Sequence, residues 1–519
     1  MKKVRSIIIV GGGSSGWMTA AYLSHTLVGT EITLIESNNV PRIGVGEATT
    51  PSLSRLMKRL RFPQWESWLP ECDGTIKTGI RFENWYKKSD MYWHPFEALD
   101  YVDDHHHTGH CWLNFRNQGD PRFQQRSSFY NSFFVSTLLN CGENKGPVTA
   151  SYAFHFNADL FGEFLRKACP DVRHILDDVI DVKLAEDGDI AELVTAEHGS
   201  VKGDLFIDST GFRRTLIRRV DPLQRFQSYA ACLFCDRAVV LRLPYQSDDS
   251  KSHEMHPYVR ASAESAGWIW TIPLYSRISS GYVYSSAFMS DDEAENELRR
   301  YWGHQRTKDA VALKVRFESG KLDSIWVKNC VAIGLSGGFV EPLESTGLVI
   351  TQVELEILAS VLDARYYDEF GIRRFNMHMQ KICDDIKQFI VAHYCLTKRD
   401  DTAFWKSVKY DTIIPEDLAA RLEVFRELLP TVATKGLEES WFFRDISWFS
   451  VLLGMNFDFH VEHVGDELLK KAQDILRGKS LVMNSFSAGY PVHYDFLKHG
   501  AYQPHGQARE VMEWGCSLA

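Results

Sequence analysis

Apolar and polar segments alternate most clearly in the first forty residues of the chain. The β-branched run from Ile7 to Val10 is typical of a buried parallel strand. A glycine-rich turn follows. The stretch from Trp17 to Leu27 then predicts a helix, and the alternation from Glu31 to Glu36 predicts a second strand. This order of elements is the strand–helix–strand opening of an α/β fold.

The pattern changes further along the chain. Residues 151–240 are mixed, and Gly203 to Asp208 closes another apolar strand. Residues 258–290 alternate as strands do. After Gly347 the apolar positions recur at helical spacing, and the remaining residues predict mostly helix with few strands.

These changes predict two modules. The first is an α/β module over residues 1–350, with an insertion around 85–150 that contributes to a substrate pocket. The second is a mostly helical module over residues 351–519 that closes this pocket.

Composition limits the class of protein without naming it. The chain has 519 residues, of which 44% are hydrophobic and 24% are charged, which is ordinary globular usage. The formal net charge of −10 and the lack of a basic block argue against a nucleic-acid partner. The N-terminal apolar run is too short for a secretory signal, and no run has the roughly 18 apolar residues of a membrane span. We therefore expect a cytoplasmic protein with no membrane partner.

Neither the cysteines nor a histidine cluster predicts a metal site. The 10 cysteines are irregularly spaced, and the Cys232–Cys235 pair has no second pair to complete a zinc set, so buried thiols are expected. Four histidines share a polar stretch with two aspartates, for which we predict a solvated loop: His105, His106, His107, His110, Asp103 and Asp104.

A glycine-rich loop gives the first indication of chemistry. Gly11, Gly13 and Gly16 form the pattern G-x-G-x-x-G, with Ser14 and Ser15 inside it. Glycines allow a tight turn and close approach of the backbone to a pyrophosphate, and the next helix directs its first amides at the negative charge. The acid that would take the ribose hydroxyls is Glu36, 20 residues after Gly16 at the end of the second strand. The segment predicts dinucleotide binding without separating FAD from NAD.

Two further strands also end in glycine turns. One ends at Asp208 and continues to Gly211, and the other is followed by Gly334. Three such turns from distant segments indicate one extended cofactor that is touched repeatedly, and FAD fits this better than NAD. No second G-x-G-x-x-G follows a strand, so no separate nicotinamide module is expected.

Four motifs occur together and carry a resemblance. Besides the glycine loop, they are Lys77 within G-T-I-K-T-G-I-R-F, the W-x-W-x-I-P hexapeptide from Trp268 to Pro273, and F-V-E-P-L-E-S-T-G ending at Gly347. Together they resemble the flavin-dependent tryptophan and indole halogenases. Further matching pieces are the I-G-V-G-E-A-T stretch and H-P-F, and the resemblance runs from the N-terminus to about residue 455.

The resemblance implies a reaction. A separate flavin reductase supplies FADH2, oxygen and chloride or bromide then give hypohalous acid, and this oxidant passes to Lys77 beside an aromatic substrate. Glu344 stabilises the cationic ring intermediate and takes its proton as a general base. A lysine ammonium can hydrogen-bond hypohalous acid or become a haloamine, and both alternatives stay open.

The resemblance also implies binding residues. The halide lies near Thr346 and Gly347, where a helix begins. Trp268, Trp270, Ile272 and Pro273 separate substrate from flavin. Further flavin contacts are expected at these positions: Gly46, Glu47, Ala48, Thr49, Gly347 and Leu348.

Each of these residues also has a plainer interpretation. A single lysine is usually a solvated surface charge, and a single glutamate usually caps a helix. Trp268 and Trp270 could be ordinary alternating aromatics of a strand. Only the joint occurrence of the motifs favours the catalytic interpretation.

The substrate pocket is predicted less completely. His94 and Phe96 match two pocket residues of the family, and a later stretch resembles the segment that closes the pocket, with these candidate contacts: Trp441, Phe442, Arg444 and Trp448. Tryptophan-specific members carry a glutamate where this chain has Arg444, with Asp445 beside it. A shift of one residue in this short match would put Asp445 in the position of that glutamate. A cation there would repel an ammonium group, so we hypothesise that indole, or a substituted or peptide-borne indole, is preferred to free tryptophan.

Two rival functions remain at this point. A flavin-dependent aromatic monooxygenase, or hydroxylase, would share the glycine loop but not the combination of Lys77, W-x-W-x-I-P and E-S-T-G. A non-catalytic flavin-binding or carrier-interacting protein would tolerate the loss of Lys77. A homodimer is expected from base rates alone.

Overall fold

The computed structural model describes most of the chain, in these ranges: 1–40, 46–62, 64–134, 151–363, 365–431, 442–487 and 490–502. The chain forms two compact units, each assembled from three stretches. Unit 1 comprises Met1–Asp73, Phe156–Ala230 and Phe317–Cys383. Unit 2 comprises Gly74–His155, Ala231–Arg316 and Asp384–Ala519. The division at residue 350 that the sequence suggested follows chain order and stays a prediction.

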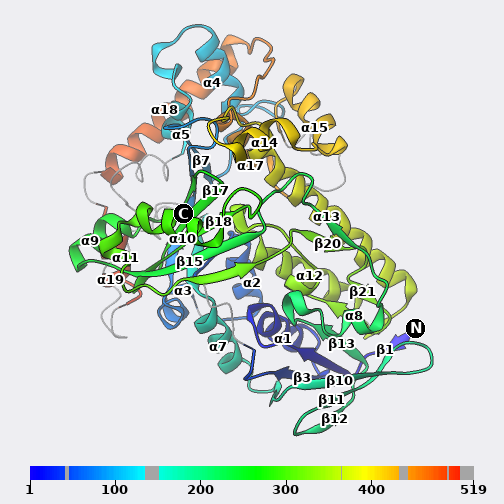
Figure 1. The fold of residues 1–519 in the computed structure, drawn as a ribbon. Coiled ribbons are helices and arrows are strands. Elements are labelled where there is room, and N and C mark those ends of the chain that lie inside the picture. The colour runs from blue at the N-terminus through cyan, green and yellow to red at the C-terminus, as the bar shows by residue number, and fades with distance from the viewer. Residues whose placement is uncertain are drawn as a thin grey trace. The chain divides into compact units, whose positions relative to one another are not determined.

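Unit 1 is organised around a sheet whose inner strands are parallel (Figure 1). In spatial order its strands are β21 (Trp326–Val327), β22 (Cys330–Ala332), β13 (Leu205–Asp208), β2 (Ser6–Val10), β3 (Glu31–Glu36) and β9 (Arg173–Leu176). Only β21 runs antiparallel to its neighbour. The four inner strands β22, β13, β2 and β3 are mainly apolar and buried, as expected for strands covered on both faces, whereas the edge strand β9 is mostly exposed.

Helix α1 (Ser14–Thr26) crosses from β2 to β3 and confirms the predicted strand–helix–strand opening. It begins three residues before the predicted start at Trp17, because Gly13 takes the N-cap position. Ala20 and Ala21 are fully buried, and these small side chains let the helix lie close to the sheet. Helices α7 (Ala158–Ala168) and α12 (Gly347–Val361) pack against α1 (Figure 1).

Smaller elements complete unit 1. Two antiparallel three-stranded sheets are formed by β10 (Val179–Leu184), β11 (Ile190–Thr195) and β12 (Gly199–Val201), and by β14 (Phe226–Ser228), β20 (Gly320–Leu322) and β23 (Gly338–Phe339). β1 (Lys2–Lys3) pairs with β24 (Tyr366–Tyr367). The short helices are α2 (Ser52–Arg59), α3 (Trp65–Trp68) and α8 (Ile217–Val220), and α13 (Glu369–Cys395) begins here.

Unit 2 contains a seven-stranded sheet that is antiparallel except at one pair. Its spatial order is β19 (Leu313–Arg316), β15 (Arg237–Pro244), β18 (Arg277–Tyr284), β17 (Gly267–Pro273), β16 (Val259–Ala263), β6 (Gly79–Glu83) and β7 (Met91–Pro95). The parallel pair joins β16 to β6. The strands predicted within residues 258–290 are confirmed as β16, β17 and β18.

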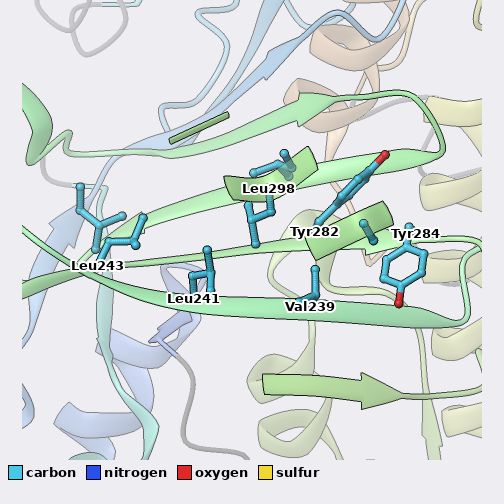
Figure 2. Close-up of a cluster of buried hydrophobic side chains, with 9 residues drawn as sticks. Val239, Leu241, Leu243, Tyr282, Tyr284 and Leu298 are labelled. Atoms are coloured by element: carbon cyan, nitrogen blue, oxygen red, sulfur yellow. The ribbon is translucent and has the colours of Figure 1, made fainter. Parts of the chain in front are cut away.

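Helix α10 (Asp291–Trp302) covers one face of this sheet through a fully buried apolar cluster (Figure 2). Leu298 of the helix faces side chains of β15, β17 and β18 across the cluster. Its members are Val239, Leu241, Leu243, Ile269, Ile278, Tyr282, Tyr284, Ala294 and Leu298. The cluster fixes the register of β17, because a one-residue slip would turn Ile269 to the other face of the sheet.

The rest of unit 2 is mainly helical. Its helices are α4 (Thr108–Asn117), α5 (Ser127–Phe133), α9 (Asp248–Glu254), α11 (His304–Thr307), α14 (Ala403–Asp411), α15 (Glu416–Glu427), α17 (Asp445–Gly454), α18 (Asp466–Ser487) and α19 (His493–His499). No strand follows β24 in the described part of the chain, which confirms the helical pattern predicted after residue 350. None of the described helices combines the length and apolarity needed to cross a membrane.

The histidine-rich stretch differs in part from its prediction. His105 is exposed, but His107 is fully buried and caps α4, where its Nδ1 accepts the Gly109 N–H at 3.0 Å. His110 lies in the first turn of α4. Burial lowers the pKa of His107 to about 3. The predicted solvated loop is therefore wrong for His107 and His110, because these rings serve the helix start. Cys232 and Cys235 are buried free thiols, as predicted.

Candidate active site

Three strand ends meet in unit 1 at the predicted cofactor turns. The register places the carboxyl ends of β2, β13 and β22 side by side. The backbone of Ser209 donates to Val10 O at 2.8 Å, and Ile333 N donates to Asp208 O at 3.0 Å. The glycine turns that follow these strands thus share one edge of the sheet, where α/β proteins bind their ligands.

Asp208 holds two of the turns together. One carboxylate oxygen accepts from Thr210 N and Oγ1 and from Ser336 Oγ, and the other accepts from the backbone amides of Leu216 and Ile217 at 2.8 and 2.9 Å. Both oxygens are therefore engaged by the protein itself. Through these contacts Asp208 fixes the position of the second and third glycine turns. Its direct contact with the cofactor stays a prediction.

The first glycine turn ends at the N-terminus of α1. Gly13 is the N-cap and supplies no side chain, so no cap side chain occupies the first amides of the helix. A Cβ on Gly13 would have no atom within 4 Å, whereas a Cβ on Gly16 would lie 1.8 Å from Gly11 O. Gly334 of the third turn lies against Ser15, since its Cβ would be 2.8 Å from Ser15 Cβ. The first amides of α1, which no cap side chain occupies, and the space beside Gly13 fit the pyrophosphate of FAD.

Glu36 ends β3 next to this turn. Its Oε2 accepts from Trp17 Nε1 at 3.3 Å and lies 3.4 Å from His174 Nε2. A Cβ on Gly12 would be 2.1 Å from the same carboxylate. The acid therefore has the location that the sequence predicted, and its bond to the ribose remains a prediction.

The described part of the I-G-V-G-E-A-T stretch forms β4 (Gly46–Ala48) in unit 1. Ala48 and Thr49 are buried. Burial raises the pKa of Glu47 to about 7, so part of this carboxyl population is neutral near pH 7. An acid held partly neutral is compatible with contact to a polyanionic cofactor.

Glu354, a buried residue of α12, is a site residue that the sequence motifs do not include. Its Oε2 accepts the Gly334 N–H at 2.8 Å and so fixes the third glycine turn. Burial raises the pKa of Glu354 to about 8. No local pattern points to this contact, because it joins residues 20 positions apart that meet only where α12 packs against the third glycine turn.

Glu354 should make stability depend on pH. In the folded protein the carboxyl keeps its proton up to about pH 8, whereas the unfolded chain releases it near pH 4.5. Between these values the folded state binds more protons, so the free energy of unfolding falls as pH rises, by at most about 1.4 kcal/mol per pH unit. Urea unfolding at several pH values gives the free energy of unfolding of wild type and of Glu354→Gln. As pH rises, this free energy should fall in the wild type relative to the variant. Parallel stability curves would contradict this assignment.

The E-S-T-G segment leads into α12. Glu344 closes a short 3-10 turn (Pro342–Glu344) and is 2% exposed. Ser345 follows with φ 58°, and Thr346 is the N-cap of α12 without a capping bond from its side chain. Thr346 Oγ1 is buried and has no hydrogen-bond partner among the described residues. An unpartnered hydroxyl and the first amides at Gly347 and Leu348 fit a small anion such as a halide.

Lys77 lies in unit 2 on β5 (Thr75–Lys77), which pairs with β8 (Ala153–Asn157). Its side chain is completely buried. Nζ lies 5.0 Å from the centre of the Phe96 ring. The interpretation of Lys77 as a solvated surface charge is therefore wrong. Burying an ammonium group costs free energy, which indicates that the buried position serves a function. The contact with Phe96 also brings two of the predicted residues together.

The W-x-W-x-I-P segment is the buried strand β17. The rings of Trp268 and Trp270 lie 6.2 Å apart. Gly281 faces Trp270 across the sheet, and a Cβ there would lie 2.2 Å from the indole, so only glycine leaves room for this ring. The end of the segment touches the lysine strand, since Thr75 Oγ1 donates to Pro273 O at 2.6 Å. Ile272 and Pro273 thus belong to a segment anchored to β5, while the barrier role stays a prediction.

The predicted pocket residues only partly meet. His94 Nε2 lies 2.9 Å from Ser447 Oγ of α17, and its ring is 6.3 Å from that of Phe96. Phe443 was not among the predicted contacts, but its ring lies 6.4 Å from that of His94 and stacks on Phe389 at 3.8 Å. A series of contacts therefore leads from Lys77 through Phe96 and His94 to α17.

The other pocket candidates lie elsewhere around α17. Trp448 is fully buried against Phe389 at 4.9 Å. Phe442 donates its backbone N–H to Asp385 at 2.5 Å. Arg444 is the N-cap of α17 with a side chain that is 65% exposed, next to Asp445. Trp441 lies outside the described residues.

Known proteins resemble this chain over most of its length. The sequence profile described as Tryptophan halogenase matches residues 6–467. Tryptophan 6-halogenase SttH of Streptomyces toxytricini is 36% identical over 455 residues, covering 82% of this chain and 84% of that protein. The 7-chloro-L-tryptophan 6-halogenase KtzR of Kutzneria sp. is 37% identical over 453 residues, covering 82% of this chain and 86% of that protein.

Solved structures resemble the fold of this chain. The SttH crystal structure superposes with a TM-score of 0.85 at 34% identity and covers 94% of this chain and 99% of its own. BrvH, a flavin-dependent halogenase from Brevundimonas, gives a TM-score of 0.83 at 28% identity, covering 96% of this chain and 99% of its own. These findings support halogenation rather than the hydroxylase alternative. The chain belongs to the tryptophan halogenase family of flavin-dependent halogenating enzymes.

Proposed function

We propose that this protein halogenates an indole-type aromatic ring, with Lys77 and Glu344 as its catalytic residues. The observation that carries the proposal is the complete burial of Lys77 with Nζ 5.0 Å over the Phe96 ring. An ammonium in this setting is held in place and shielded from bulk water, which strengthens any hydrogen bond that it donates.

Reduced FAD with oxygen supplies the oxidising power that converts chloride or bromide into hypohalous acid. The first amides of α1 bind the pyrophosphate, and Thr346 with the amide of Gly347 holds the halide. Lys77 donates to the hypohalous acid and makes its halogen more electrophilic. Glu344 stabilises the positive charge of the attacked ring and takes its proton.

We further propose that the reduced flavin comes from a separate reductase, since the sequence shows no second dinucleotide fingerprint. Trp268 and Trp270 keep the substrate away from the flavin in this scheme, so hydroxylation is discouraged. The homodimer and the cytoplasmic location expected from the sequence stay predictions.

The proposal is tested by direct assay. The protein is supplied with FAD, a flavin reductase, NADH, oxygen, and chloride or bromide, together with a panel of indoles. Mass spectrometry should find a product with the isotope pattern of the halogen used. Oxygen insertion without halogen would instead favour an aromatic hydroxylase.

Arg444 should set the order of substrates. Its exposed cation at the start of α17 would repel the ammonium of free tryptophan, so we predict a higher kcat/KM for indole than for tryptophan. Arg444→Glu should raise the tryptophan-to-indole ratio of kcat/KM by about tenfold. Arg477→Glu, at another exposed arginine in α18, is the matched control. Comparable turnover of tryptophan and indole by the wild type would overturn the prediction.

A further inference from the structure

The short strand that carries Lys77 is anchored by hydrogen bonds within it and directly after it. Thr78 donates both its backbone N–H and its hydroxyl to Pro257 O, at 2.7 and 2.8 Å. Thr75 Oγ1 donates to Pro273 O. Two buried histidines from distant parts of unit 2 complete the set, and the catalytic scheme above uses neither of them.

His493 lies at the free edge of strand β5 and accepts a hydrogen bond from it. Ile76 N donates to His493 Nε2 at 3.2 Å, and His493 Nδ1 lies 3.0 Å from Met255 O. Nε2 must therefore accept and Nδ1 must carry the proton, which defines the Nδ1–H tautomer. Because Ile76 directs its N–H at the imidazole, this N–H points away from β8, and the ring stands where another strand would pair.

His155 lies on β8, the strand that pairs with the opposite edge of β5. It lies directly opposite Thr75 in the β5–β8 register, so its side chain shares a face with those of Thr75 and Lys77. Nδ1 is 2.9 Å from Thr75 Oγ1. The hydroxyl already donates to Pro273 O, so it must accept from His155, which is again the Nδ1–H tautomer.

Both rings are uncharged at neutral pH. Burial lowers the pKa of His493 to about 4 and holds the pKa of His155 well below its ordinary value, with the charge of Lys77 as a further cause for His155. A protonated His493 could not accept from Ile76. The two hydrogen-bond patterns therefore need the neutral form, which burial secures.

The C-terminal segment adds one more anchor. Tyr502 donates its hydroxyl to Gly74 O at 2.7 Å, directly before β5. Its ring stacks on Tyr275 with centroids 3.4 Å apart, two residues after the W-x-W-x-I-P segment. Helix α19 and the residues after it thus touch both the start and the middle of the lysine strand.

We propose that His493 and His155 are positioning residues for Lys77, which hold β5 from its two sides so that the ammonium keeps the orientation that halogenation requires. This inference rests on the proposed role of Lys77. With this role, the C-terminal helix α19 contributes to the geometry of the site, although His493 is 417 positions away from its partner Ile76 in the sequence.

The test separates the two bonds of His493. Glutamine can accept from Ile76 but does not reach Met255 O in the same pose, whereas asparagine can donate to Met255 O but leaves Ile76 N–H without its acceptor. His493→Gln should keep halogenated product per flavin oxidised within about threefold of wild type. His493→Asn and His493→Phe should lose on the order of tenfold or more, because a small misplacement of a reacting group is expensive.

Three controls distinguish positioning from simple destabilisation. His499→Gln changes an exposed histidine of the same helix and should have no effect. Melting temperature and the rate of flavin oxidation are measured for every variant, and positioning predicts a lower product yield per flavin at an unchanged oxidation rate. On the other side of β5, Thr75→Val should lower this yield, and Thr75→Ser should restore it.

The outcomes are distinct. Equal yields for His493→Gln and His493→Asn, or yields that merely follow the melting temperature, would overturn the positioning role. Should the variants fail to fold, nitrogen NMR of labelled histidines in the wild type still decides: the resonances assigned to His493 and His155 are expected to show Nδ1–H imidazoles that do not titrate between about pH 5.5 and 8, and titration of either of these two rings would contradict the proposal. If the wild type itself gives no halogenated product, the proposed function has failed instead.

Discussion

Lys77→Met is expected to lower halogenated product by on the order of 10³-fold while reduced flavin and oxygen are still consumed. Methionine fills the same buried space as the lysine stem and keeps contact with the Phe96 ring, but it has no proton to donate. The loss should therefore appear in the transfer of halogen and leave the chemistry of the flavin intact. Product is measured by mass spectrometry and flavin oxidation by absorbance in the same sample.

Lys321→Met is the matched control for this variant. Lys321 is also buried, 2% exposed, and donates to Gln380 O at 3.1 Å in unit 1. Its replacement should lower the melting temperature without changing the ratio of product to flavin consumed. Normal halogenation by Lys77→Met would show that the buried lysine is structural and that the proposed role is wrong.

Gly16→Ala is expected to abolish flavin binding and to destabilise the protein without cofactor by about 1–3 kcal/mol or more. A Cβ at this position would lie 1.8 Å from the carbonyl oxygen of Gly11, which is part of the backbone and cannot rotate away. The turn between β2 and α1 must open, so the first amides of α1 lose their arrangement. Thermal unfolding and a flavin titration measure the two effects.

Gly13→Ala separates cofactor contact from folding. A Cβ there has no protein atom within 4 Å, and Gly13 has φ −74°, which alanine adopts freely. The melting temperature of the protein without cofactor should stay unchanged, while the affinity for FAD should fall because the methyl group occupies the space of the pyrophosphate. Wild-type affinity in Gly13→Ala would mean that the pyrophosphate does not approach this residue.

Local patterns predicted the framework of unit 1 well. The apolar run at β2, the glycine turn and the acid at the end of β3 each follow from propensity and short-range spacing. Even here the structure corrected the start of α1, since the N-cap is set by Gly13. The polar stretch around His107 shows the opposite case. Its composition suggested a solvated loop, but packing buries the ring as a helix cap.

The sequence by itself determined the strand–helix–strand opening, the W-x-W-x-I-P strand and the family, because these depend on neighbours along the chain. It also singled out Lys77 and Glu344 as candidates. Only the tertiary structure decided that Lys77 is buried over Phe96 and that His155 and His493 flank its strand. Such contacts join residues far apart in the chain, so they depend on the collective burial of apolar surface that holds those residues together in the folded state.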